Sequence, residues 1–165
     1  MNLDFRLPQQ DPCSFREIVA DPQANLVEET DLVVDRVNGR QYLEGQCVVL
    51  PKRQAPTLFD LSDLEMNEVL KVARRVGMAV SAAAGAEGLL LYQNNGVASG
   101  QEVPHFHLHV VPQWMTDSPK GKLPPHIRRS EGIVFETVES TRLNAKELRQ
   151  MSARIREHLT GKQEK

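Results

Sequence analysis

One stretch of the chain, residues 62–85, constrains the fold most, because its apolar side chains lie along a single stripe. Apolar residues recur there at helical spacing: Val69, Val72, Ala73, Val76, Ala79, Val80 and Ala83. Ser62, with Glu65 three residues later, forms a capping box typical of a helix start, and Gly85 is typical of a helix end. A helix with one apolar stripe has to bury it against another element. The pattern therefore predicts a long helix packed on a sheet.

Shorter segments on both sides of this helix show strand and helix patterns. We expect strands at 25–29, 31–37, 46–50, 88–93, 105–111 and 132–138. Asn38-Gly39 predicts a hairpin turn, because both residues tolerate positive φ. Further helices are expected at 13–20 and, after a second capping box at Asn144 and Glu147, as far as about residue 159. The order predicts one α+β domain over 1–165: an antiparallel sheet, one main helix packed on it and an extra C-terminal helix.

Length and charge exclude several classes of protein. The 165 residues suit one domain, and a net charge of -2 with a pI near 6.2 gives no electrostatic reason to expect a nucleic-acid partner. No run approaches the length of a membrane span, and the first ten residues contain no apolar signal segment, so we expect a cytoplasmic protein with no membrane partner. Two cysteines are too few for a disulfide framework.

Three of the five histidines lie at alternate positions of one predicted strand. His105, His107 and His109 should project from one side of it, roughly 6–7 Å apart. The apolar residues between them should point into the core: Phe106, Leu108 and Val110. Each imidazole brings two polar nitrogens that need partners. Packing alone does not explain such a row, so it is our candidate functional site.

Two chemistries suit this row of imidazoles. Neutral histidines two apart on a strand can bind zinc, and an imidazole can also act as a nucleophile. A zinc site usually includes a carboxylate or cysteine, and Glu102 is the one such residue nearby in the sequence. The polar loop 94–101 precedes the row and is able to aim backbone N–H groups at an anion. We therefore favour nucleophilic catalysis with no metal and no cofactor.

The same residues resemble a known family. Residues 94–112, with Gly100-Gln101 followed by His105-Phe106-His107-Leu108-His109-Val110-Val111, resemble the signature of the histidine triad (HIT) superfamily, His-φ-His-φ-His-φ-φ with φ apolar. Residues 45–52 resemble its G-(H)-x-L-V-x-P-K strand, and 13–19 its C-x-F-x-x-I segment. The resemblance covers about 13–114 and leaves 115–165 as an extension.

This resemblance implies a nucleotide hydrolase or nucleotidyltransferase that acts on nucleoside polyphosphates or phosphoramidates. His107 would attack the α-phosphorus and form a nucleotidyl-histidine, with His105 and His109 orienting it. Asn94, Gly100 and Gln101 would serve the phosphate. Asn38 would meet the ribose hydroxyls, although an asparagine in Asn-Gly is equally explained as a turn residue. The family also implies a homodimer.

Three positions depart from the family pattern. Arg16 replaces the second cysteine of a C-x-x-C, so we expect no structural zinc there. Gln54 replaces the histidine of P-K-x-H, and an amide cannot carry positive charge. Glu102 replaces a Ser or Thr that would follow Gly-Gln. These departures keep a nucleotide-binding module with little or no turnover open as an alternative.

Overall fold

The computed structural model describes residues 4–11, 13–20, 25–115 and 140–160. Its centre is a five-stranded antiparallel sheet in the order β1-β2-β4-β6-β5. The strands are β1 (Leu26–Glu29), β2 (Val33–Val37), β4 (Cys47–Pro51), β5 (Gly88–Tyr92) and β6 (Leu108–Gln113). The α+β class and the antiparallel sheet are as predicted, whereas the strand expected at 132–138 lies outside the described residues.

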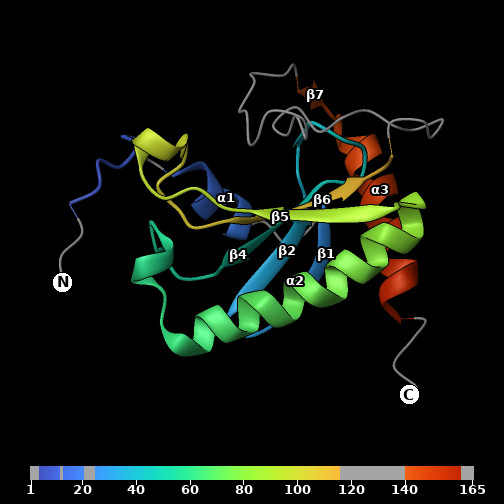
Figure 1. The fold of residues 1–165 in the computed structure, drawn as a ribbon, viewed down its shortest axis with the longest axis horizontal. Helices are drawn as coiled ribbons and strands as arrows, with labels where there is room; N and C mark the ends of the chain where they lie inside the picture. The colour runs from blue at the N-terminus through green and yellow to red at the C-terminus, as the bar shows by residue number, and fades with distance from the viewer. Residues whose placement is uncertain (1–3, 12, 21–24, 116–139, 161–165) are drawn as a thin grey trace.

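The long helix α2 (Asp63–Ala84) lies along one face of this sheet (Figure 1). Its predicted ends are confirmed: Ser62 accepts a hydrogen bond from the Glu65 backbone N–H, and Gly85 has a φ of 63°. The predicted apolar stripe packs in the main core with Val33, Val37 and Val49 of the sheet. Among the described residues, no helix combines the length and apolar character that a bilayer crossing requires.

Two further helices complete the layers. Helix α1 (Ser14–Ala20) packs its Phe15 and Val19 against Val34 and Val48, on the sheet face opposite α2. Helix α3 (Ala145–Thr160) packs against α2, β1 and β2. It begins with the predicted capping box, in which Asn144 accepts from the Glu147 backbone N–H and the Glu147 carboxylate accepts from that of Asn144.

The predicted hairpin at Asn38-Gly39 is wrong. The chain turns there, but β3 (Arg40–Gln41) pairs with β7 (Thr141–Arg142) instead of returning along β2. Strand β2 pairs with β1 on one side and with β4 on the other. Both edges of β2 are therefore already occupied, which leaves β3 to form a separate two-stranded ribbon.

Candidate functional site

The three histidines lie at the start of β6, and two of them precede the strand itself. We expected a strand from residue 105, but β6 begins at Leu108. The backbone N–H of Phe106 donates to Ala55 O at 2.6 Å, and that of His105 donates to Val103 O at 2.8 Å, so neither joins the sheet. The predicted alternation nevertheless holds, because Phe106, Leu108 and Val110 are all buried in the main core.

A single contact decides which ring nitrogen of His107 carries the hydrogen. Nδ1 of His107 lies 2.8 Å from the backbone oxygen of His105. A carbonyl oxygen only accepts, so Nδ1 carries the hydrogen and Nε2 keeps its lone pair. Burial lowers the pKa of His107, outweighing the hydrogen bond to His105, which raises it. His107 is therefore a neutral imidazole with a basic Nε2 at neutral pH.

His105 is buried and held by the segment that follows β4. Its Nε2 donates to Pro51 O at 2.8 Å, and its Nδ1 lies 3.3 Å from Oε1 of Gln54. The Gln54 amide nitrogen in turn donates to Pro104 O at 2.5 Å. Burial lowers the pKa of His105. Gln54, which stands where the family pattern has a histidine, thus holds the turn at Pro104, while its amide oxygen faces the unprotonated Nδ1 of His105 without a hydrogen between them.

His109 is positioned by residues that the sequence did not single out. Its ring stacks on Tyr92 of β5 with centroids 4.3 Å apart and planes 13° apart. Its Nδ1 lies 3.0 Å from the amide nitrogen of the fully buried Gln46. His107 meets His109 edge-on at 4.8 Å and Phe15 of α1 at 4.9 Å. Cross-strand register pairs Tyr92 with His109, and that pairing became visible only once the sheet order was known.

The loop before the three histidines has most of its backbone N–H groups bonded to oxygens of the protein itself. The buried Gln101 accepts from the Gly96 N–H at 2.6 Å and donates to Pro56 O and Val103 O at 2.7 and 2.9 Å. The backbone N–H groups of residues 96, 97, 99, 100 and 101 likewise donate to oxygens within the protein. Gln101 therefore supports the loop, because both ends of its amide bond other parts of the protein.

The remaining predicted residues occupy the loops on either side. Asn38 accepts the Arg40 backbone N–H at 3.2 Å, which is the turn chemistry expected of Asn-Gly. Gly100 has a φ of 84°, and a Cβ there would lie 3.4 Å from the Asn94 amide nitrogen. Glu102 is exposed, and its carboxylate lies 3.8 Å from the Arg40 guanidinium.

The described residues contain no group of three His, Cys, Asp or Glu side chains arranged to hold a metal ion. Four of the six imidazole nitrogens of the triad face protein groups, namely two backbone carbonyls and two glutamine side chains. Such an arrangement provides one nucleophilic nitrogen beside one N–H donor.

The amino-acid sequence is similar to those of two proteins named as nucleotide phosphatases. The chain is 32% identical over 88 residues to a fission yeast (Schizosaccharomyces pombe) bis(5'-nucleosyl)-tetraphosphatase [asymmetrical], covering 53% of this chain and 48% of that protein. It is 30% identical over 91 residues to a Dictyostelium discoideum bis(5'-adenosyl)-triphosphatase, covering 55% and 61%. The chain thus spans about half to three fifths of these relatives.

A solved structure shares the fold over most of both chains. It is a HIT-like protein described as involved in cell-cycle regulation, from Bartonella henselae, with a TM-score of 0.69 and 23% identity over 90% of this chain and 98% of that one. The HIT domain family model matches residues 20–115, which include the sheet, α2 and all three histidines. The protein therefore belongs to the HIT family.

Proposed function

We propose that this protein is a nucleotide hydrolase or nucleotidyltransferase that acts at the α-phosphate of a nucleoside polyphosphate or phosphoramidate. The observation that carries the proposal is the hydrogen bond from His107 Nδ1 to His105 O, because it leaves the Nε2 lone pair of a neutral imidazole for attack. The printed names of the relatives, a nucleosyl tetraphosphatase and an adenosyl triphosphatase, support this substrate class.

The proposed reaction has two displacements at phosphorus. The Nε2 lone pair of His107 forms a bond to the α-phosphorus, and the bond to the leaving group breaks with its electron pair going to the leaving group. Water or another acceptor then attacks the same phosphorus, and the phosphorus–nitrogen electron pair returns to Nε2. The nucleoside monophosphate, or its ester with the acceptor, is released.

The neighbouring residues receive roles that follow from their positions. Asn38 has its side-chain oxygen engaged in the turn, so its amide N–H groups are the atoms suited to a ribose hydroxyl. Asn94 has its amide nitrogen beside Gly100, and because the backbone N–H of Gly100 already donates to Val97 O, the Asn94 amide is the group suited to a phosphate oxygen. Gln101 acts by keeping this loop in shape.

The proposal is tested by a screen and a trapping experiment. The protein is incubated with dinucleoside polyphosphates, nucleoside phosphoramidates and nucleoside phosphosulfates, and release of monophosphate is measured. Rapid acid-free quenching and mass spectrometry should then find the nucleotidyl group on His107. His107→Ala should lose at least about 1,000-fold in turnover while retaining nucleotide affinity, because the covalent step is lost and most contacts stay.

Two results would contradict this proposal. Binding of nucleotides without turnover of any of them would favour the binding-module alternative. Full turnover by His107→Ala would remove His107 as the nucleophile. A change of similar size outside the triad, His158→Ala on α3, is the matched control and should leave turnover unchanged.

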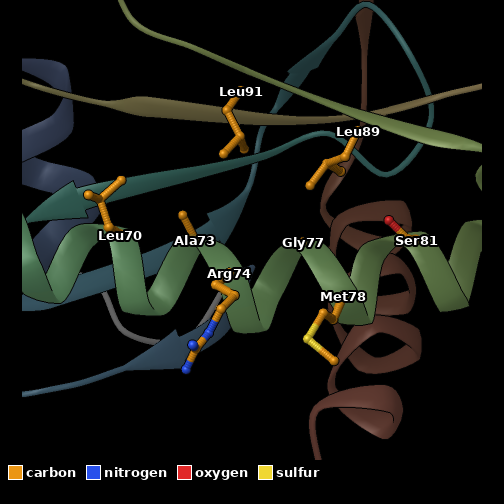
Figure 2. A pocket seen from close by; sticks show the side chains of 8 residues that line it. All are labelled: Leu70, Ala73, Arg74, Gly77, Met78, Ser81, Leu89 and Leu91. Carbon is orange, nitrogen blue, oxygen red and sulfur yellow. The ribbon is translucent and has the colours of Figure 1, made fainter.

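We also propose that two copies pair through the outer face of α2 and β5. Strand β5 is an edge of the sheet, and its Leu89 and Leu91 are about two fifths exposed. Figure 2 shows them reaching toward the side of α2 that carries Leu70 and Gly77, and Met78 beside them is also exposed. Among the described residues β5 is an edge strand, and such an edge beside an apolar surface suits a two-fold interface.

Light scattering at micromolar concentration tests the pairing. The expected mass is twice the 18.6 kDa of the chain. Leu91→Asp should shift the mass toward a single chain, because it places a charge in the proposed interface, whereas Leu64→Asp on an exposed turn of α2 should not. A monomeric mass for the unaltered protein would contradict the proposal.

A further inference from the structure

We propose that Gln46 is a positioning residue that holds His109 in the tautomer with hydrogen on Nε2, so that His109 acts as an N–H donor beside the nucleophile. The proposal rests on the proposed function for its catalytic meaning, but the tautomer itself can be measured without any substrate. It gives a role to a fully buried glutamine at the point where β4 begins.

The orientation of the Gln46 amide follows from its backbone contact. One end of the amide faces the backbone N–H of Tyr42 at 3.0 Å. A backbone N–H only donates, so that end has to be the oxygen, Oε1. The other end, 3.0 Å from Nδ1 of His109, is then the NH₂ group, which only donates. Gln46 therefore cannot accept a hydrogen from His109.

The tautomer of His109 follows directly. Nδ1 has to accept the hydrogen bond from Gln46, so the hydrogen of the neutral ring is on Nε2. A hydrogen on Nδ1 would place two donors against each other in a buried position, which costs the hydrogen bond and leaves both groups unsatisfied. The stack on Tyr92 fixes the plane of the same ring, with centroids 4.3 Å apart.

The two neighbouring histidines thus carry their hydrogens on opposite nitrogens. His107 donates from Nδ1 to a backbone carbonyl, which leaves a lone pair on Nε2. His109 accepts at Nδ1, which leaves a hydrogen on Nε2. Their ring centroids are 4.8 Å apart. A phosphate attacked by His107 would therefore meet an N–H donor on the next ring, suited to a phosphoryl oxygen or to the leaving group.

Nuclear magnetic resonance of ¹⁵N-labelled histidine in the full chain tests the tautomer. In the unaltered protein, His109 should show a protonated Nε2 and an unprotonated Nδ1. Gln46→Glu keeps an oxygen for the Tyr42 N–H but sets a carboxylate oxygen against Nδ1, so the hydrogen should move to Nδ1. Turnover should then fall about 10- to 100-fold, the usual effect of removing a partner that orients a functional histidine, with nucleotide affinity changed much less.

Gln41→Glu is the matched control. Gln41 is buried in the same turn and bonds the Gly45 N–H and the Gln46 backbone oxygen rather than His109. It should lower the melting temperature without moving the His109 hydrogen, which separates a structural effect from positioning. Should Gln46→Glu fail to fold, Gln46→Met removes the amide donor at similar length and should give a mixture of the two tautomers.

The outcomes separate this inference from the proposed function. A hydrogen on Nδ1 of His109 in the unaltered protein overturns the inference whatever the activity. The expected tautomer change with turnover unaffected overturns the catalytic role of His109 as donor, while the proposed function stands. The expected tautomer in a protein that turns over no nucleotide supports the positioning and overturns the proposed function instead.

Discussion

Two buried carboxylates, Glu65 at the start of α2 and Asp35 in the middle of β2, have opposite surroundings. Both oxygens of Glu65 accept from the Arg53 guanidinium at 2.8 Å, and Ser62 donates to one of them as well. Neither oxygen of Asp35 has a hydrogen-bond partner among the described residues. The pKa of Glu65 is lowered to about 2, first by Arg53, whereas burial raises the pKa of Asp35 well above its usual range.

The comparison shows that only the ionised carboxylate, Glu65, is linked to the histidine site. Arg53, the partner of Glu65, belongs to the segment after β4 that also brings Pro51 and Gln54 to His105. Through Arg53, the Glu65 carboxylate is thus connected to the segment whose Pro51 oxygen holds His105. Asp35 also lies on the α2 side of the sheet, with Val33 and Val37, whereas His107 contacts Phe15 of α1 on the opposite side. Because burial raises its pKa, the folded state favours the protonated form of Asp35, and stability falls as pH rises.

The largest effect in this comparison should follow Glu65→Gln. A pKa lowered from 4.5 to about 2 corresponds to about 3 kcal/mol of stability, present above the unfolded pKa and lost as pH falls toward 2. We expect Glu65→Gln to lower the free energy of unfolding by about 2–3 kcal/mol at pH 7, measured in urea. Turnover should also fall, because the segment holding His105 loosens. Equal stability of the two proteins at pH 7 would contradict the comparison.

Asp35→Asn should change stability with the opposite pH dependence. Because the folded pKa of Asp35 is raised, the folded state binds the extra proton, and stability falls as pH rises above the unfolded pKa near 3.9. The asparagine variant does not titrate, so its free energy of unfolding relative to that of the unaltered protein should rise between pH 5 and pH 8. Turnover should be unchanged. A constant difference across this range would show that Asp35 is ionised when folded.

The pH profile of turnover is a smaller test on the histidine face. Burial lowers the pKa of His107, so a larger fraction of the nucleophile should be neutral at pH 6 than of an ordinary imidazole. An ordinary imidazole would be only about one quarter neutral there. We expect kcat/KM to fall by clearly less than fourfold between pH 7.5 and pH 6, measured with the substrate that the screen identifies. A loss of about fourfold between these pH values would assign His107 an unshifted pKa.

The smallest effect is expected at Glu102. Its carboxylate is exposed and lies 3.8 Å from Arg40, so its repulsion of a phosphate is largely screened and partly offset. Glu102→Thr should tighten binding of adenosine monophosphate about two- to threefold at low salt, measured by calorimetry, and less at high salt. Glu44→Thr, which breaks a similar exposed pair with Arg154, is the control. Unchanged or weaker binding by Glu102→Thr would rule out repulsion.

Local signals accounted for the elements that depend on a few adjacent residues. The ends of α2 were predictable because the Ser62–Glu65 capping box and Gly85 act within one helical turn. The strand pattern around the histidines was predictable from alternation, since Phe106 and Leu108 are apolar and buried. The hairpin at Asn38-Gly39 was not, because a turn signal does not say which strand edge is still unpaired.

The sequence by itself determined that three imidazoles recur at alternate positions and that one long capped helix packs on the sheet. Only the tertiary structure decided where the hydrogen lies on each ring. Gln46 is 63 residues from His109, and Pro51, whose oxygen accepts from His105, is 54 residues from it. The tautomer of a histidine depends on whether its neighbour donates or accepts, and these neighbours meet the triad only when β4 pairs with β6.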